Sequence, residues 1–599
     1  MRHFVKCLAL LLGGALLLSG CSAGAQRTAG RSDLSGAGGA PSAETGASSG
    51  AEGAQETDLQ GEDGGDGRPV YRMELALDTA GTEEYGHARL TGTVSVSFTN
   101  DSSDVWEQVC LRDYVPAILA EDLASSGETD AISGLSSGIA AVREGERTLS
   151  FTQGTDPTVI FVALEEPMQP GDRRTLEVEY RAEIPCGGYR LSWFPVGEQE
   201  EGLVFSLGPF YPVLSVYDQG EWNQAPYFLE GECFYAPCGD YEVSLTLPSD
   251  FTVVSTGSES TDGAGHWTLR AERVRDFAIL ASNCYESVTE TVEGVEVRSW
   301  YLDCREDARQ SGELALQAAK DALETFTRRY GPYVYDQLDV VESVYEFGGL
   351  EYPALVRINQ TYLTDQEEEQ RLWSNVVHEV AHQWFYAALG NDQYREAWLD
   401  ESFAAFSELV CLEDTGAPAE QVEACRTGWE SGQETLQFQY IDLSYDAYEG
   451  VPGLGDYGGG GQYIHAVYDR GPLFLYQLRE AMGEEAFFGF VQRWYMEHMF
   501  DTVTTQAFLE ALYESCGDDP EVAELVARMF STPYPSGPSR SSPRMGRGGR
   551  AVEQNSPIKS VQRFPGVSGG PLRLFGKHSL KGMPWPLKNL RRAETQTNL

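Results

Sequence analysis

Residues 371–385, RLWSNVVHEVAHQWF, place two histidines four residues apart among apolar neighbours. On a helix, His378 and His382 lie on one face, where both imidazoles can bind a single metal ion. Glu379 follows the first histidine directly, so its carboxylate can take a proton from water at that ion and pass it on. The apolar neighbours predict a buried helix, and polar side chains inside such a helix need partners, which a metal ion supplies.

A third metal ligand is predicted at Glu401. Residues 398–406, WLDESFAAF, are expected to form the next helix, and eighteen residues, 383–400, separate His382 from Glu401. Two antiparallel helices with a short link can bring this carboxylate to the histidines and leave a fourth position open for water. Two imidazoles and one carboxylate favour zinc. The sequence therefore predicts one Zn²⁺ ion held by His378, His382 and Glu401.

This set of residues resembles the aminopeptidase N-like gluzincin metallopeptidases, a family that includes leukotriene hydrolase. Residues 383–385 and 398–399 are similar to the family pattern as well, whereas residues 400–402 read Asp-Glu-Ser where the family has Asn-Glu-Gly. The resemblance covers residues 70–530. It implies a multidomain chain, with an N-terminal antiparallel β-sheet domain followed by a thermolysin-like α+β zinc peptidase domain.

Residues 347–353, FGGLEYP, resemble the family's Gly-x-Met-Glu-Asn motif, with Leu and Tyr in place of Met and Asn. Gly348 and Gly349 permit close approach of the backbone to a ligand. The carboxylate of Glu351 can bind the ammonium group of a substrate N-terminus through a charge-assisted contact. The resemblance thus implies removal of N-terminal residues rather than internal cleavage.

Residues 463–471, YIHAVYDRG, resemble the family's Tyr-x-Lys-Gly segment, which implies that Tyr468 donates a hydrogen bond to the oxyanion of the tetrahedral intermediate. Glu408 lies two turns after Glu401 on the predicted helix. It can either hydrogen-bond a ligand histidine or be an exposed helix residue, and both readings stay open. His465 is expected to be structural, and the glycine-rich residues 453–461 are expected to form a loop beside the site.

The rest of the chain divides by pattern. Apolar and polar residues alternate within residues 69–290, which predicts the N-terminal β domain. Residues 291–533 mix short strand candidates with helical spacing, and they form the predicted catalytic domain. The strand candidates are residues 295–302, 340–344 and 354–358, and the first helix is predicted over residues 305–329.

The N-terminus predicts secretion and lipid attachment. The apolar run over residues 8–18 is too short to span a bilayer and is typical of a secretory signal. Residues 18–21, LSGC, resemble the bacterial lipobox, which implies a signal peptide over residues 1–21 with Cys21 as the lipid-attachment site. Residues 22–68 are rich in Gly, Ala, Ser and acidic residues and are predicted to be a flexible tether. The expected location is extracytoplasmic, anchored to the membrane by the lipid.

The net charge of −49 argues against nucleic acid as a partner, because phosphates would be repelled. The tail, residues 534–599, is different: from residue 536 onward it carries 12 Lys and Arg against 2 Asp and Glu, and it is predicted to be basic and disordered. Cys233 and Cys238 are close enough for a disulfide, although free buried thiols explain them equally well.

The predicted function is zinc-dependent hydrolysis of N-terminal residues from peptides with a free N-terminus. Two alternatives stay open. The chain could be a non-catalytic peptide-binding surface lipoprotein, but binding alone requires neither Glu379 nor Tyr468. It could also be an endopeptidase of the same fold, against which Glu351 argues.

Overall fold

The computed structural model describes residues 67–82, 86–126, 137–197, 202–227, 231, 233–345, 348–434, 440–442 and 463–535. The described residues all belong to the unit from Gly64 onward. The predicted signal peptide with Cys21, residues 22–66 of the predicted tether, residues 453–461 and the tail beyond residue 535 lie outside the described residues. Among the described residues, no helix is long and apolar enough to cross a membrane.

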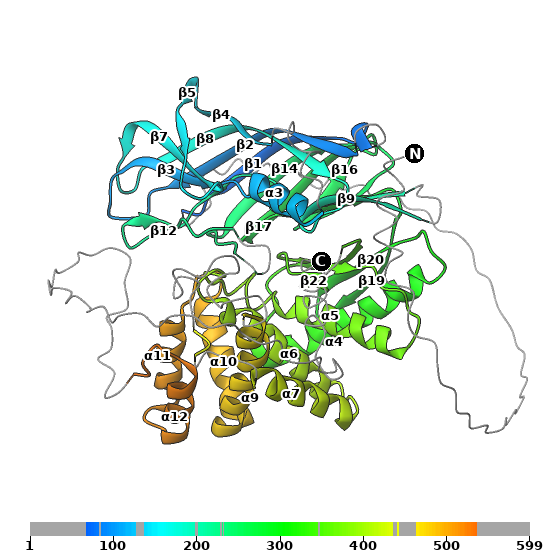
Figure 1. The fold of residues 1–599 in the computed structure, drawn as a ribbon, viewed down its shortest axis with the longest axis vertical. Helices are drawn as coiled ribbons and strands as arrows, with labels where there is room; N and C mark the ends of the chain where they lie inside the picture. The colour runs from blue at the N-terminus through cyan, green and yellow to red at the C-terminus, as the bar shows by residue number, and fades with distance from the viewer. Residues whose placement is uncertain are drawn as a thin grey trace, which may run out of the picture. The chain divides into compact units, whose positions relative to one another are not determined.

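Sheets make up residues 70–282, here called the β region (Figure 1). The largest has eight strands in the order β16-β17-β14-β1-β2-β8-β4-β5. Its neighbouring strands are antiparallel, except that β1 and β14 are parallel. In chain order the strands are β1 (Val70–Asp78), β2 (His87–Thr99), β4 (Gly138–Glu144), β5 (Arg147–Leu149), β8 (Arg173–Pro185), β14 (Gly239–Thr246), β16 (Ser258–Thr261) and β17 (His266–Val274).

The described residues of the β region also form two four-stranded sheets, a two-stranded hairpin and helix α3. The sheet orders are β15-β18-β10-β9 and β11-β3-β7-β6, and β12 pairs with β13. These elements are β3 (Trp106–Arg112), α3 (Val115–Ser126), β6 (Phe151–Gln153), β7 (Val159–Met168), β9 (Leu191–Val196), β10 (Gly202–Leu207), β11 (Val213–Leu214), β12 (Tyr217–Asp218), β13 (Glu221–Trp222), β15 (Thr252–Ser255) and β18 (Ile279–Ser282).

The predicted alternation explains how these sheets pack. In β1, Tyr71, Met73 and Leu75 are buried while the residues between them are exposed, so one face of the sheet covers the core. Tyr71 stacks on Tyr241 of β14, with ring centroids 4.6 Å apart. Within this region Cys238 is a free thiol, so the candidate disulfide between Cys233 and Cys238 is not what the structure contains.

Residues 285–529, here called the α+β region, combine a five-stranded sheet with helices. The sheet order is β19-β20-β21-β23-β22, in which β20, β21 and β23 are parallel. The predicted boundary between residues 290 and 291 falls inside β19, which pairs with β20 along its whole length. The strands are β19 (Tyr285–Val292), β20 (Val295–Leu302), β21 (Gln337–Ser343), β22 (Gly349–Leu350) and β23 (Leu355–Asn359).

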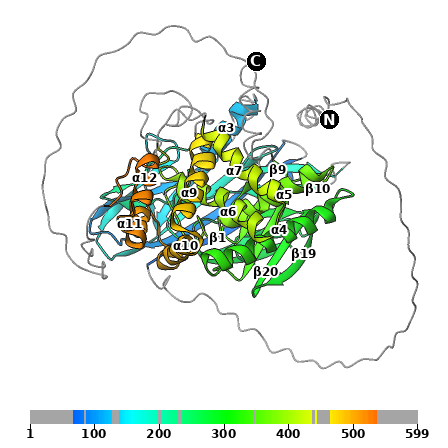
Figure 2. The same ribbon diagram turned by 90° about the horizontal axis from the view of Figure 1, so that it is seen from below.

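Helices α4 and α5 pack against the sheet of the α+β region, and α4, α5 and α6 pack against one another (Figure 2). Around them an aromatic core includes Trp384, Trp398 and Phe403, all buried. The helices are α4 (Ala308–Tyr330), α5 (Gln366–Ala381), α6 (Glu401–Asp414), α7 (Ala419–Gln433), α9 (Gly471–Met482), α10 (Glu484–His498), α11 (Thr505–Cys516) and α12 (Pro520–Met529), with a 3₁₀ turn η2 (Ala397–Leu399) and a π-helix η4 (His465–Arg470).

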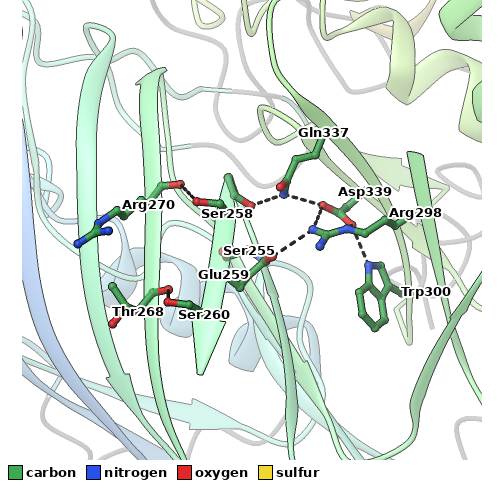
Figure 3. A network of polar contacts seen from close by, with 11 residues as sticks. Ser255, Ser258, Glu259, Ser260, Thr268, Arg270, Arg298, Trp300, Gln337 and Asp339 are labelled. Atoms are coloured by element: carbon green, nitrogen blue, oxygen red, sulfur yellow. Dashed lines mark hydrogen bonds and ion pairs between the residues drawn. The ribbon is translucent and has the colours of Figure 1, made fainter. Parts of the chain in front are cut away.

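A buried ion-pair cluster joins the two regions (Figure 3). Arg298 of β20 donates two hydrogen bonds of 2.6 Å to the carboxylate of Asp339 and one of 3.1 Å to Glu259 of β16. Trp300 and Gln337 also donate to Asp339. Burial and the neighbouring Asp339 raise the pKa of Glu259 to about 7. The single arginine therefore balances two buried carboxylates at this junction.

Arg298→Met should lower the free energy of unfolding by about 3–5 kcal/mol at neutral pH, because it leaves buried carboxylates without their cation. The loss should shrink as the pH falls below 7: a carboxyl whose pKa is raised in the fold favours folding at low pH, and that contribution disappears as the pH rises. Urea unfolding measures both effects. Arg309→Met, which breaks an exposed ion pair with Glu313, is the matched control and should cost less than about 1 kcal/mol. Equal losses in the two variants would contradict the role given to Arg298.

Candidate metal centre

Helix α5 carries the predicted ligand His378, and the predicted ligand His382 is the cap residue at its end. The sequence of the helix explains where it begins. The side chain of Asp365 accepts hydrogen bonds from the backbone N–H groups of Glu367 and Glu368, at 3.0 and 3.1 Å. Acidic residues in the first turn suit the positive end of the helix dipole. The second half of the helix is buried against the core and brings His378 and Glu379 inside with it.

His378, His382 and Glu401 meet as predicted. Their ligand atoms all lie within 4.8 Å of one another. Oε2 of Glu401 is 3.2 Å from Nε2 of His378 and 3.4 Å from Nε2 of His382. Glu401 is the first residue of α6, where the side chain of Asp400 accepts a 2.8 Å hydrogen bond from its backbone N–H. The cap at the start of α6 thus places the third ligand opposite the two histidines.

The electrostatics of these three side chains fit a cation. Burial alone would lower the pKa of both histidines. The neighbouring carboxylates together outweigh it, Glu401 and Glu408 at His378 and Glu401 and Glu351 at His382, and they raise the pKa of His382 to about 10 and that of His378 well above 6.5. Burial would raise the pKa of Glu401, yet the histidines hold it well below its usual range. The cluster therefore favours positive charge between its members, which a divalent ion can supply in place of protons. Two imidazoles and a carboxylate are a zinc ligand set.

Each histidine has a second partner that fixes its ring. Oε1 of Glu408 lies 2.9 Å from Nδ1 of His378, and Glu408 also accepts a hydrogen bond from Ser374. The backbone carbonyl of Phe385 lies 3.1 Å from Nδ1 of His382. With its proton on Nδ1, each ring presents Nε2 to the metal. Of the two readings left open for Glu408, the structure supports the hydrogen bond to a ligand histidine.

Gly349 makes room for Glu379. A Cβ atom at Gly349 would lie 2.1 Å from Oε1 of Glu379, so any other residue on this edge strand would displace the carboxylate of Glu379 from its present position. The backbone carbonyl of Gly348 accepts a hydrogen bond from Asn359 on β23. The contact of both glycines with substrate stays a prediction, whereas the packing of Gly349 on the carboxylate of Glu379 is observed.

Glu351 lies beside the metal ligands as a buried carboxylate. Burial raises its pKa to about 8, and the nearby charges of Glu401 and Glu379 act in the same direction, while His382 opposes them. Its hydrogen bond comes from the amide of Gln393, at 3.3 Å, and the same amide nitrogen donates to Asp400 at 2.9 Å. The positive charge of Arg190 also lowers this pKa, but it does not offset the effect of burial.

Tyr468 reaches the site through the π-helix η4, which the sequence did not predict. Its ring lies against that of His378, with centroids 6.1 Å apart and planes 21° from parallel. The hydroxyl of Ser402, next to the ligand Glu401, donates a 2.6 Å hydrogen bond to the carbonyl of Val467 and so ties η4 to α6. His465 is buried and lies 2.5 Å from Asp469, in agreement with its expected structural role.

Sequence reasoning missed Gln393 and Ser402. Gln393 lies in the connection between α5 and α6, where no motif distinguishes it, and only the folded connection brings its amide to Glu351 and Asp400. Ser402 was visible as a departure from the family pattern, but its partner, the carbonyl of Val467, lies 65 residues further along the chain. A departure next to a ligand was therefore the only available signal.

Glu408→Ala should weaken the affinity for Zn²⁺ by about 10–100-fold, because His378 loses the acceptor that orients its ring. Competition with a chelating indicator measures this affinity without any assay of turnover. Glu420→Ala, an exposed glutamate on α7, is the control and should bind zinc as the unmodified chain does. If both variants bind zinc equally well, Glu408 does not orient the ligand.

Comparison with known proteins agrees with this site. Residues 314–531 match the peptidase family M1 domain. Aminopeptidase N of Streptomyces lividans is 30% identical over 220 residues, which cover 36% of this chain and 25% of that protein. Aminopeptidase B of Mus musculus is 24% identical over 375 residues, which cover 59% of this chain and 52% of that protein. The chain thus spans between a quarter and about half of the length of these relatives.

A solved structure shares the fold. The M1 zinc metallopeptidase from Deinococcus radiodurans superposes with a TM-score of 0.54 at 17% identity, covering 78% of this chain and 96% of that one. The predicted order, a β-sheet domain followed by an α+β zinc peptidase domain, is confirmed by this match and by the sheets and helices described above. The chain therefore contains a peptidase family M1 domain, at residues 314–531, and its fold is similar to that of an M1 zinc metallopeptidase.

Proposed function

We propose that the chain is a zinc-dependent aminopeptidase that hydrolyses N-terminal residues from peptides on the outer side of a membrane. The observation that carries the proposal is Glu351, a carboxylate only 8% exposed, beside the metal ligands and bonded to an amide rather than to a cation. A buried carboxylate in this setting is stabilised by a positive charge. The ammonium group of a peptide N-terminus supplies that charge and places the first peptide bond at the metal.

In this proposal, each residue of the site has a separate role in the reaction. When bound, zinc supplies Lewis-acid polarisation of the scissile carbonyl and activation of water. Glu379 accepts the proton of the attacking water and returns it to the leaving amine. The hydroxyl of Tyr468, on the side of His378, donates to the oxygen on which negative charge develops. Glu351 holds the N-terminus, so that binding energy is used to orient the bond that breaks.

The site contains four carboxylates, those of Glu351, Glu379, Asp400 and Glu401, and their different surroundings give them different pKa values or contacts. Glu401 is held ionised by the two histidines, whereas the pKa of Glu351 is raised to about 8 and that of Asp400 to about 7, chiefly by burial. Glu379 packs directly on the backbone at Gly349. An ammonium ion entering beside Glu351 favours its ionised form, so substrate binding itself completes the charge balance of the site. The relatives named aminopeptidase N and aminopeptidase B support the same activity.

Aminoacyl anilides with a free N-terminus should be hydrolysed by the full chain, and chelation should abolish this until zinc is restored. Glu379→Gln should reduce kcat by about 10²–10⁴-fold, since it removes the proton acceptor. Glu351→Gln should reduce kcat/KM by about 10–100-fold, which is the usual effect of losing a hydrogen bond to a charged group. The release of the chromogenic amine is the measurement, and zinc content is determined for each variant.

A peptide with a blocked N-terminus separates the alternatives in the same assay. The proposal predicts no cleavage of the blocked peptide. Efficient cleavage would establish an endopeptidase instead. Zinc-loaded protein that binds peptides but hydrolyses neither substrate would establish a binding lipoprotein. Glu420→Gln serves as the control for loss of a carboxylate away from the site, and its activity should match that of the unmodified chain.

We further propose that a lipid on Cys21 anchors the enzyme, on the basis of the apolar run and the sequence LSGC at residues 18–21. Labelling with a fatty acid analogue in a bacterial host should modify the chain, and Cys21→Ser should abolish the label and release the protein from the membrane fraction. Cys7→Ser, directly before the apolar run over residues 8–18, is the matched control and should keep both the label and the membrane attachment. Retention of label in the Cys21 variant would exclude this attachment site.

A further inference from the structure

Tyr386, four residues after the ligand His382, has an unusual backbone conformation. Its φ angle is +131°, in a range that side chains other than glycine rarely adopt. Such a conformation persists only where the surroundings enforce it. Tyr386 is buried, and its backbone N–H donates to the carbonyl of Leu389 at 3.0 Å. Something beyond this local turn must hold the residue in place.

Two consecutive residues of the β region do so. Nε of Arg275 donates a 2.8 Å hydrogen bond to the carbonyl oxygen of Tyr386, and the hydroxyl of Tyr386 donates to Oδ2 of Asp276. Arg275 and Asp276 lie between β17 and β18, more than 100 residues before Tyr386 in the chain. The two ends of Tyr386, its carbonyl group and its hydroxyl, are thus both held by the neighbouring region.

The position of Arg275 is itself closely determined. Arg275 is only 4% exposed, and its guanidinium donates a second hydrogen bond, of 2.6 Å, to the carbonyl of Asp501. A Cβ atom on Gly390 would lie 2.0 Å from Cζ of Arg275, so the guanidinium passes directly over a glycine of the connection that follows α5. The absence of a side chain at Gly390 is what allows the arginine to reach Tyr386.

The strained residue is one peptide bond away from a group that contacts the metal ligand. The carbonyl of Phe385 accepts the hydrogen bond from Nδ1 of His382, at 3.1 Å. This carbonyl belongs to the planar peptide group that joins Phe385 to Tyr386, and φ of Tyr386 is the rotation of that plane about the N–Cα bond. With the hydroxyl and carbonyl of Tyr386 fixed, its φ angle therefore sets the direction in which the Phe385 carbonyl points.

We infer that Arg275 and Asp276 are positioning residues for the metal centre. By holding Tyr386 at φ +131°, they direct the Phe385 carbonyl at His382 and keep Nε2 of that histidine aimed at the ion. Zinc affinity then depends on the contact between the β region and the connection after α5. The inference concerns zinc binding and does not require the proposed aminopeptidase activity.

Zinc affinity of the full chain, measured by competition with a chelating indicator, tests this. Tyr386→Phe and Asp276→Ala each remove the hydroxyl contact and should weaken zinc binding by about tenfold or more, the usual effect of losing an outer partner of a ligand. Tyr386→Gly removes more atoms, yet glycine adopts this φ without strain, so it should bind zinc more tightly than Tyr386→Phe does. In the Tyr386→Gly background, Asp276→Ala should have no further effect.

Tyr180→Phe is the matched control, because its hydroxyl donates to the buried Asp113 at 2.8 Å within the β region. It should lower stability but leave zinc affinity unchanged. Circular dichroism of each variant shows that the fold is kept. A purely packing role for Tyr386 predicts the opposite order, with Tyr386→Gly the weaker zinc binder. That order, or zinc affinities of Tyr386→Phe and Asp276→Ala within about twofold of the unmodified chain, would overturn the inference.

Discussion

The contact between Glu401 and the two histidines connects the end of α5, with His378 in its last turn and His382 as its cap, to the helix that begins at Glu401. It is a contact between charged or chargeable groups in a buried place, where a lone carboxylate or imidazolium would be costly. The apolar core around Trp384, Trp398 and Phe403 brings α5 and α6 together. This packing places the three ligand side chains close to one another inside the protein. The remaining features of the site serve to orient, balance or surround these three side chains.

Orientation is supplied from three directions. Glu408, two turns after Glu401 on the same helix, fixes the ring of His378. The carbonyl of Phe385, in the turn after α5, fixes that of His382. Asp400 caps α6 and shares the amide of Gln393 with Glu351, so the proposed ammonium-binding carboxylate and the third metal ligand, Glu401, are linked through two buried side chains, Gln393 and Asp400. A small displacement of any of these elements is thereby transmitted to the metal.

The β region contributes to the site as well as flanking it. Arg275 and Asp276 contact the turn after α5, and the Glu259–Arg298–Asp339 cluster ties β16 to the sheet of the α+β region. Both contacts are buried and carry charge. Apolar contact alone would allow neighbouring surfaces to slide, whereas bidentate and charged hydrogen bonds have definite directions. The placement of these contacts is consistent with a site whose geometry depends on both regions.

The sequence alone predicted the elements that depend on local pattern. The spacing of His378 and His382 follows from the helical repeat, the strand predicted over residues 295–302 coincides with β20, and the helix predicted over residues 305–329 is α4 with bounds shifted by a few residues. The third ligand, Glu401, and the order of the two domains were also predicted, because both can be recognised from motifs and their order along the sequence. Local periodicity is a property of neighbouring residues, and it can be recognised before any folding is considered.

Only the tertiary structure decided which distant groups meet. It placed Gln393 between Glu351 and Asp400, joined Ser402 to the carbonyl of Val467 in an unpredicted π-helix, and gave Tyr386 a backbone angle that its residue type disfavours. None of these contacts produces a periodic pattern in the sequence, because each depends on the relative position of segments that are separated by loops of irregular conformation. The sequence determined the chemistry available to this protein, and the packing of its two regions determined the directions in which those groups point, because direction is set by contacts that close only in the folded chain.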